Sequence, residues 1–95
     1  HMLQKDMVID MAENKEQKAA IIGIFIKDFD AVPKVNGILH DFAEDIIGRI
    51  GIPYRAKELH VISIILSTTP DRISALSGQL GRIEGVTAKA MQANL

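Results

Sequence analysis

The chain has 95 residues, of which 47% are hydrophobic and 24% are charged, a size and composition that favour one domain with a packed core over disorder. Its 11 basic and 12 acidic residues give a formal net charge of −1, so no basic field is available to attract nucleic acid without a partner. The absence of cysteine excludes disulfides, thiolate metal sites and cysteine nucleophiles, and it fits a cytoplasmic protein.

The first 18 residues are predicted to form an N-terminal arm. His1-Met2 is typical of a remnant left by tag removal. In residues 3–18, Leu3, Met7 and Met11 are spaced four apart, which predicts a short helix with a narrow apolar stripe. We expect neither a secretory signal nor a membrane anchor, because no apolar run approaches the length that spans a bilayer. The folded domain is predicted to cover residues 19–95.

A strand and a helix are predicted next. Ala19–Lys27 is apolar on both alternating faces, as expected for a central strand. Asp28 or Asp30 can then cap a helix that tolerates Pro33 only in its first turn. The apolar residues that follow at helical spacing predict its buried face: Val32, Val35, Leu39 and Phe42.

The segment IIGRIGIPYR, Ile46 to Arg55, is predicted to be a bent edge strand. Its two glycines, Gly48 and Gly51, indicate a bulge or a close backbone approach, and we expect one of them to occupy a position that excludes a side chain. Pro53 removes a ladder donor, which an edge strand tolerates. The remaining polar and aromatic side chains are of types that interfaces favour, so we expect them at an oligomer interface or at the rim of a cleft between subunits: Arg49, Tyr54 and Arg55.

The second half of the chain repeats the pattern. Glu58–Thr68 is again apolar on both faces, and Thr69 and Pro70 mark the cap and first position of a helix. Gly85 is expected to turn the chain into a last strand, VTAKAMQ. The predicted buried stripe of the helix is Ile73, Leu76, Leu80 and Ile83.

The order strand, helix, strand, strand, helix, strand predicts an α+β, ferredoxin-like fold with an antiparallel sheet in the order 4-1-3-2. This order places the first and third strands at the centre of the sheet. They are the two segments that are apolar on both faces, Ala19–Lys27 and Glu58–Thr68. Because two helices cover one face of such a sheet, the other face is predicted to be covered by a second copy of the chain, in a homodimer or tetramer.

Metal and cofactor sites are not predicted. The only internal histidines are His40 and His60, and Glu58 would share a strand face with His60 because the two are two residues apart. These three residues are weak candidates for a metal site, since one histidine with carboxylates binds transition metals poorly.

Two long runs, KVNGILHDFAEDIIGRIGIPYR and VISIILSTTPDRISALSGQLGRIEGV, resemble the family of proposed regulators of the iron-only hydrogenase system. The resemblance covers residues 20–90, and its markers include Asn36, Gly48-Arg49, Gly51 and Tyr54. It implies an ACT-like domain similar to the ligand-binding domain of the nickel regulator. That regulator uses histidines on a corresponding strand and a cysteine for metal, where this chain has one histidine and no cysteine. It also uses a separate segment for DNA contact, which this chain lacks.

The leading hypothesis is therefore a non-enzymatic, ligand-sensing ACT-like regulator that works as a homo-oligomer and holds a small-molecule effector between protomers. Its candidate ligand or interface residues are Asn36, Arg49, Gly51, Tyr54 and Arg55. A purely structural protein-interaction module is the alternative. The third is an acylphosphatase-like enzyme, since GRIGIPYR is similar to the phosphate loop of that family on the same fold. Here, however, no helix N-terminus follows the segment to bind phosphate.

Overall fold

The computed structural model describes residues 17–93, which form one four-stranded sheet and two helices. The predicted arm of residues 3–18 lies almost wholly outside the described residues. The elements in chain order are β1 (Lys18–Ile26), a 3-10 turn η1 (Phe29–Ala31), α2 (Val32–Asp41), η2 (Ala43–Asp45), β2 (Ile46–Tyr54), η3 (Arg55–Lys57), β3 (Leu59–Thr68), α3 (Pro70–Gly81) and β4 (Val86–Ala93). All pairings are antiparallel, and the order β2-β3-β1-β4 confirms the predicted α+β class and the order 4-1-3-2.

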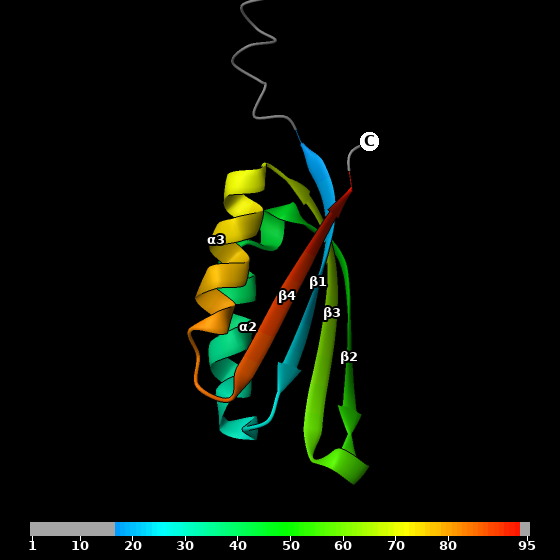
Figure 1. Ribbon diagram of the computed structural model, residues 1–95, viewed down its shortest axis with the longest axis vertical. Coiled ribbons are helices and arrows are strands. Elements are labelled where there is room, and N and C mark those ends of the chain that lie inside the picture. Colours follow the sequence, from blue (N-terminus) through cyan, green and yellow to red (C-terminus); the bar gives the residue numbers. More distant parts are fainter. Residues whose placement is uncertain (1–16, 94–95) are drawn as a thin grey trace, which may run out of the picture.

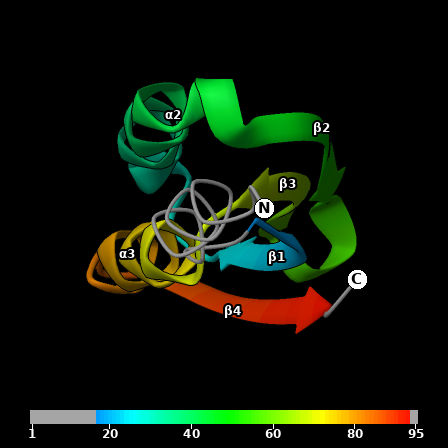
Figure 2. The same cartoon turned by 90° about the horizontal axis from the view of Figure 1, so that it is seen from above.

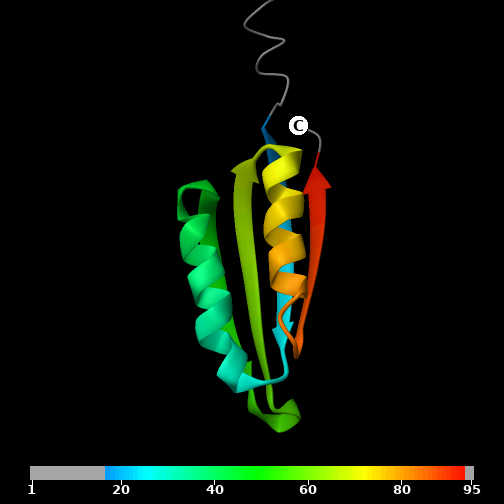
Figure 3. The ribbon, with the colours of Figure 1, turned by 90° about the vertical axis from the view of Figure 1, so that its left-hand side faces the viewer.

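Both helices cover the same face of the sheet, which leaves the other face without a helical layer (Figures 1, 2 and 3). The two central strands, β1 and β3, each send alternate side chains under the helices, as their two-faced apolar pattern predicts. The resulting core is composed of Ile22, Ile24, Ile26, Ile62, Ile64 and Leu66 from the sheet and of Val35, Leu39, Ile73, Leu76 and Leu80 from the helices, all at most 2% exposed.

The two helices begin differently. The prediction for α3 is confirmed: Thr69 is its N-cap and accepts a hydrogen bond from the backbone N–H of Arg72, and Pro70 is its first residue. The side chain of Asp28 caps η1 instead of α2, by accepting from the N–H of Asp30 at 2.9 Å. The aspartate cap predicted for the first helix therefore lies one turn earlier, because η1 leads the chain into α2.

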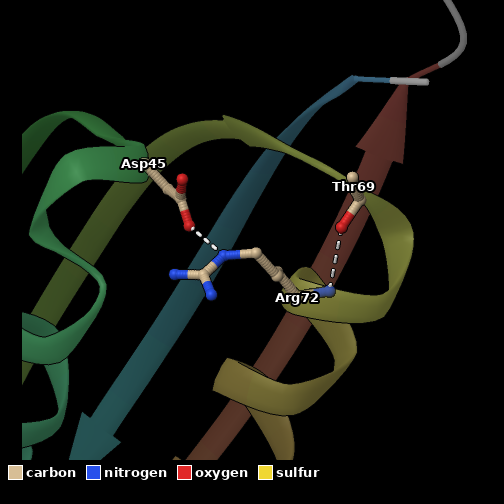
Figure 4. A network of polar contacts seen from close by, with 3 residues as sticks. All are labelled: Asp45, Thr69 and Arg72. Atoms are coloured by element: carbon tan, nitrogen blue, oxygen red, sulfur yellow. Dashed lines mark hydrogen bonds and ion pairs between the residues drawn. The ribbon is translucent and has the colours of Figure 1, made fainter. Parts of the chain in front are cut away.

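An ion pair that the sequence did not predict connects the two halves of the domain (Figure 4). Arg72, in the first turn of α3, donates from Nε to Oδ2 of Asp45 in η2 at 2.6 Å. The same guanidinium lies over the ring of Phe42, 4.8 Å from its centroid. Phe42 directly follows α2, and Asp45 directly precedes β2. The contact therefore ties α3 to the segment that connects α2 with β2.

β2 is an edge strand with an irregular start, as predicted. Its pairing with β3 shifts between Ile46 and Gly48, which leaves Ile47 as an extra residue. The expectation that Gly48 or Gly51 excludes a side chain is wrong. An added Cβ would meet no atom within 4 Å at Gly48, and its nearest neighbour at Gly51 would be Nε2 of His60 at 3.5 Å. The reason is that no segment of residues 17–93 packs closely over β2 at these two positions.

The glycine that the fold requires is Gly85, in the turn between α3 and β4. Its φ is +83°, a conformation that other residues rarely adopt, and an added Cβ would lie 3.0 Å from Cβ of Asp28. Its carbonyl accepts a hydrogen bond from the N–H of Lys27 at 2.8 Å. This turn therefore passes close to the end of β1 and sets where β4 begins.

Candidate functional site

The sheet face opposite the helices, here called the open face, carries large apolar side chains that remain exposed to water. The strand register shows that these side chains lie side by side: Ile21 pairs with Ile65 on one side and with Met91 on the other, and Ile52 pairs with Val61, which pairs with Phe25. Seven side chains on this face are 42–66% exposed: Ile21, Phe25, Ile50, Ile52, Tyr54, Ile65 and Met91. Isolated exposed apolar residues are common, whereas on this face they form a continuous group across four strands.

The open face also has a depression at the end where β1 begins. A hollow of about 290 Å³ lies there, and its lining is almost entirely apolar, with Ala19, Ile21, Ile65, Met91 and Ala93 among the contributing residues. The face is therefore shaped as well as apolar, so a partner surface can interlock with it.

A second feature, here called the α2–β2 cleft, lies on the helix side of the edge strand. It measures about 290 Å³ and is lined by Asn36, Leu39, His40, Ala43, Ile46 and Arg49. Arg49 pairs in register with the buried Ile64, so its side chain points to the helices and donates from an NH2 group to Oδ1 of Asn36 at 3.0 Å. Asn36 and His40 are four residues apart and share one face of α2.

The structure divides the predicted ligand or interface residues between these two features. Arg49 and Asn36 meet in the α2–β2 cleft, and Tyr54 belongs to the open face. Gly51 is on the helix side of β2, because it pairs with the buried Ile62. Arg55 is exposed in η3, beyond the end of the strand.

The weak metal candidates do not come together. His40 is on α2, whereas His60 is on β3 and forms an edge-to-face contact with Phe29, with ring centroids 6.3 Å apart. Glu58 has a left-handed backbone conformation in the turn before β3, so it does not share a strand face with His60. Within residues 17–93, no group of three or more histidine, aspartate or glutamate side chains is placed to hold a metal ion.

Sequence reasoning missed two aspects of these sites. It placed Arg49 and Tyr54 together at an oligomer interface or at the rim of a cleft between subunits, although the two are five positions apart in a strand, so their side chains point to opposite faces. It also considered His40 only as one of three weak metal candidates, although its spacing from Asn36 places both on one helix face next to the edge strand. Both signals were present in the sequence.

In the part of the chain that the structure describes, neither helix is long and apolar enough to cross a membrane.

Comparison with known proteins gives a family and a structural relative. A family model described as "TM1266-like: Iron-only hydrogenase system regulator, putative" matches residues 18–90. The solved structure of the uncharacterized protein TM1266 from Thermotoga maritima is 39% identical to this chain, with a TM-score of 0.79. That match covers 83% of this chain and 100% of the other. No curated protein matches the chain.

Proposed function

Since this chain belongs to the TM1266-like family of iron-only hydrogenase system regulators, we propose that it is a non-enzymatic, ligand-sensing regulator that acts as a homo-oligomer. In this proposal its ferredoxin-like arrangement is an ACT-like domain, in which a bound effector changes how protomers pack. The observation that carries the proposal is the exposed apolar open face.

A second copy of the chain is the partner that suits this face best. Among the residues that the register places there, only Lys89 is charged within residues 17–93, so the face offers little to a strongly acidic or basic partner. An apolar surface can associate with its own copy about a two-fold axis without opposing like charges. Burial of the seven exposed side chains would then remove them from water.

The size of the face is adequate for a stable dimer. Four strands about 4.8 Å apart and about 30 Å long project an area of roughly 570 Å². This projected area, which leaves out the relief of the side chains, is of the same order as the value of about 800 Å² per partner found in stable complexes.

The regulatory role is supported by the description of the family, and the α2–β2 cleft supports the sensing role, because it is a concave site lined by both polar and apolar side chains. A purely structural interaction module would share the open face but would need no ligand. An effector that binds the protein and changes its assembly therefore separates the two functions.

The test is native mass spectrometry of untagged protein, combined with light scattering over a range of micromolar concentrations. We expect a dimer or tetramer, because the open face is apolar over all four strands. A retained small molecule in the assembly would favour the sensor over the structural module. A stable monomer at all concentrations would contradict the proposal.

A further inference from the structure

We propose that the α2–β2 cleft binds a small organic monocarboxylate, with Arg49 as the group that recognises its charge. This inference rests on the ligand-sensing role proposed above, for which it supplies the chemical class of the ligand. The cleft is built from one chain, so it does not need the partner to be complete.

Within residues 17–93, Arg49 has no counter-ion for its charge. Within residues 17–93, the one arginine that forms an ion pair is Arg72, and its partner is Asp45 in η2, next to the start of β2. Asp45 is therefore occupied, and the hydrogen-bond partner of Arg49 is the neutral side-chain amide of Asn36. Arginine carries five N–H donors in a planar fork that matches a carboxylate. One of those donors is used by Asn36, and the others are available to a ligand.

Asn36 both orients the guanidinium and adds donors of its own. Because arginine only donates hydrogen bonds, Asn36 must turn its carbonyl oxygen Oδ1 to Arg49. The distance between Oδ1 and the guanidinium nitrogen is 3.0 Å. The amide N–H groups of Asn36 are then left for an oxygen of the ligand. His40 lies one turn further along the same face of α2 and can donate another hydrogen bond.

The lining of the cleft selects for size and polarity. Its apolar part consists of Leu39, which is buried, of Ile46, which is half-buried, and of Ala43, which is exposed. A volume of about 290 Å³ is at the lower end of the range for ligand pockets, so a short aliphatic carboxylate fits and a nucleotide does not. One guanidinium in the lining also suits a single negative charge better than the double charge of phosphate.

The cleft is also placed to affect the open face. Arg49 and Ile50 are consecutive residues of β2, and their side chains lie on opposite sides of the sheet. A ligand that draws Arg49 toward α2 therefore acts on the strand that carries Ile50 and Ile52 on the open face. β2 is an edge strand held on one side only, so it can respond without disrupting the core.

The experiment is a titration of ¹⁵N-labelled protein followed by amide chemical shifts, with sodium pentanoate as the probe. We expect saturable shifts at Asn36, His40 and Arg49. 1-Pentanol has the same carbon chain without the charge. Its affinity should be lower by about tenfold or more, because charge-assisted hydrogen bonds are lost. Sodium phosphate should not compete with pentanoate at equal concentration.

Two variants test the assigned residue against a matched control. Arg49→Ala should weaken pentanoate binding by about tenfold or more, whereas Arg82→Ala, which removes the same charge from an exposed position at the end of α3, should not. Arg49→Gln is a second variant in case the first disturbs the fold. Equal affinity for acid and alcohol, or unchanged binding in the Arg49 variants, would overturn the inference and leave the Arg49–Asn36 bond as a structural tie.

The same titration in an Ile65→Glu background separates this inference from the proposed assembly. Ile65 lies on the open face, so a monomeric Ile65→Glu protein should still bind pentanoate in its cleft. Saturable binding by a wild-type protein that proves monomeric would support the cleft and contradict the assembly. A wild-type oligomer with no saturable shifts at the cleft would overturn the inference alone.

Discussion

The Ile65→Glu substitution should dissociate the oligomer without unfolding the protomer. Ile65 and Ile64 are consecutive in β3, but Ile65 is 47% exposed on the open face and Ile64 is fully buried under the helices. A charge at Ile65 therefore remains in water when the protomer is alone. It becomes buried only when a second sheet covers the open face.

The magnitude follows from the burial of this side chain. Covering an isoleucine that is about half exposed contributes about 1 kcal/mol, and this contribution is lost in the variant. An unpaired carboxylate buried in its place costs about 3 kcal/mol or more. Because a two-fold interface contains the change twice, the total is about 8 kcal/mol, which raises the dissociation constant by about 10⁵-fold to 10⁶-fold.

The assay is sedimentation velocity over a concentration series, with thermal melts at each concentration. We expect the wild type to sediment as an oligomer whose melting temperature rises with concentration, and the variant to sediment as a folded monomer whose melting temperature does not. The matched control is Ala75→Glu, which adds the same charge to an exposed position on α3. If Ile65→Glu leaves the oligomer intact, or if Ala75→Glu disrupts it equally, association through the open face is refuted.

Three further predictions concern the turns, the ion pair and metals. Gly85→Ala should lower the free energy of unfolding by about 1–3 kcal/mol, because φ is +83° and the new Cβ would lie 3.0 Å from Asp28. Gly51→Ala should not lower it, since its Cβ has room. Urea titration of both variants measures the two losses, and equal losses would contradict this prediction. A double-mutant cycle of Arg72→Met and Asp45→Asn should give a coupling energy of about 0.5–1 kcal/mol, because Arg72 is 43% exposed and solvent screens the pair; no coupling would show that the contact does not stabilise the fold. Untagged, dialysed protein should contain no stoichiometric nickel, zinc or iron by elemental analysis, and metal that is retained by the wild type but lost in His60→Ala would contradict this expectation.

The topology could be predicted from the sequence because two independent signals agreed. The segments around Ile22 and Ile64 are apolar on both faces, and the connection rules place the same two strands at the centre of the sheet. Thr69 and Pro70 are the cap and the first residue of α3, as predicted, because a capping side chain and proline act locally.

The errors have a common physical origin in contacts between distant segments. Whether a glycine is required depends on what packs against it: an Asp28 neighbour crowds Gly85, whereas nothing in the described chain closes the space at Gly48. The pairing of Arg72 with Asp45 spans 27 residues and is set by how α3 approaches η2, which no local pattern encodes. Arg72, and not Arg49, is the ion-pair partner of Asp45, and Arg49 lies in the cleft beside Asn36.

The two outer strands of the sheet differ in what they offer to another backbone. β2 has an extra residue at Ile47 and a proline at position 53, two features that make its ladder irregular. β4 pairs with β1 without a register shift from Val86 to Ala93 and contains no proline. Within residues 17–93, β4 is therefore the one regular edge strand, and it can pair with one other protomer. No regular edge then remains, so growth by strand addition ends at two chains and does not continue into a fibre.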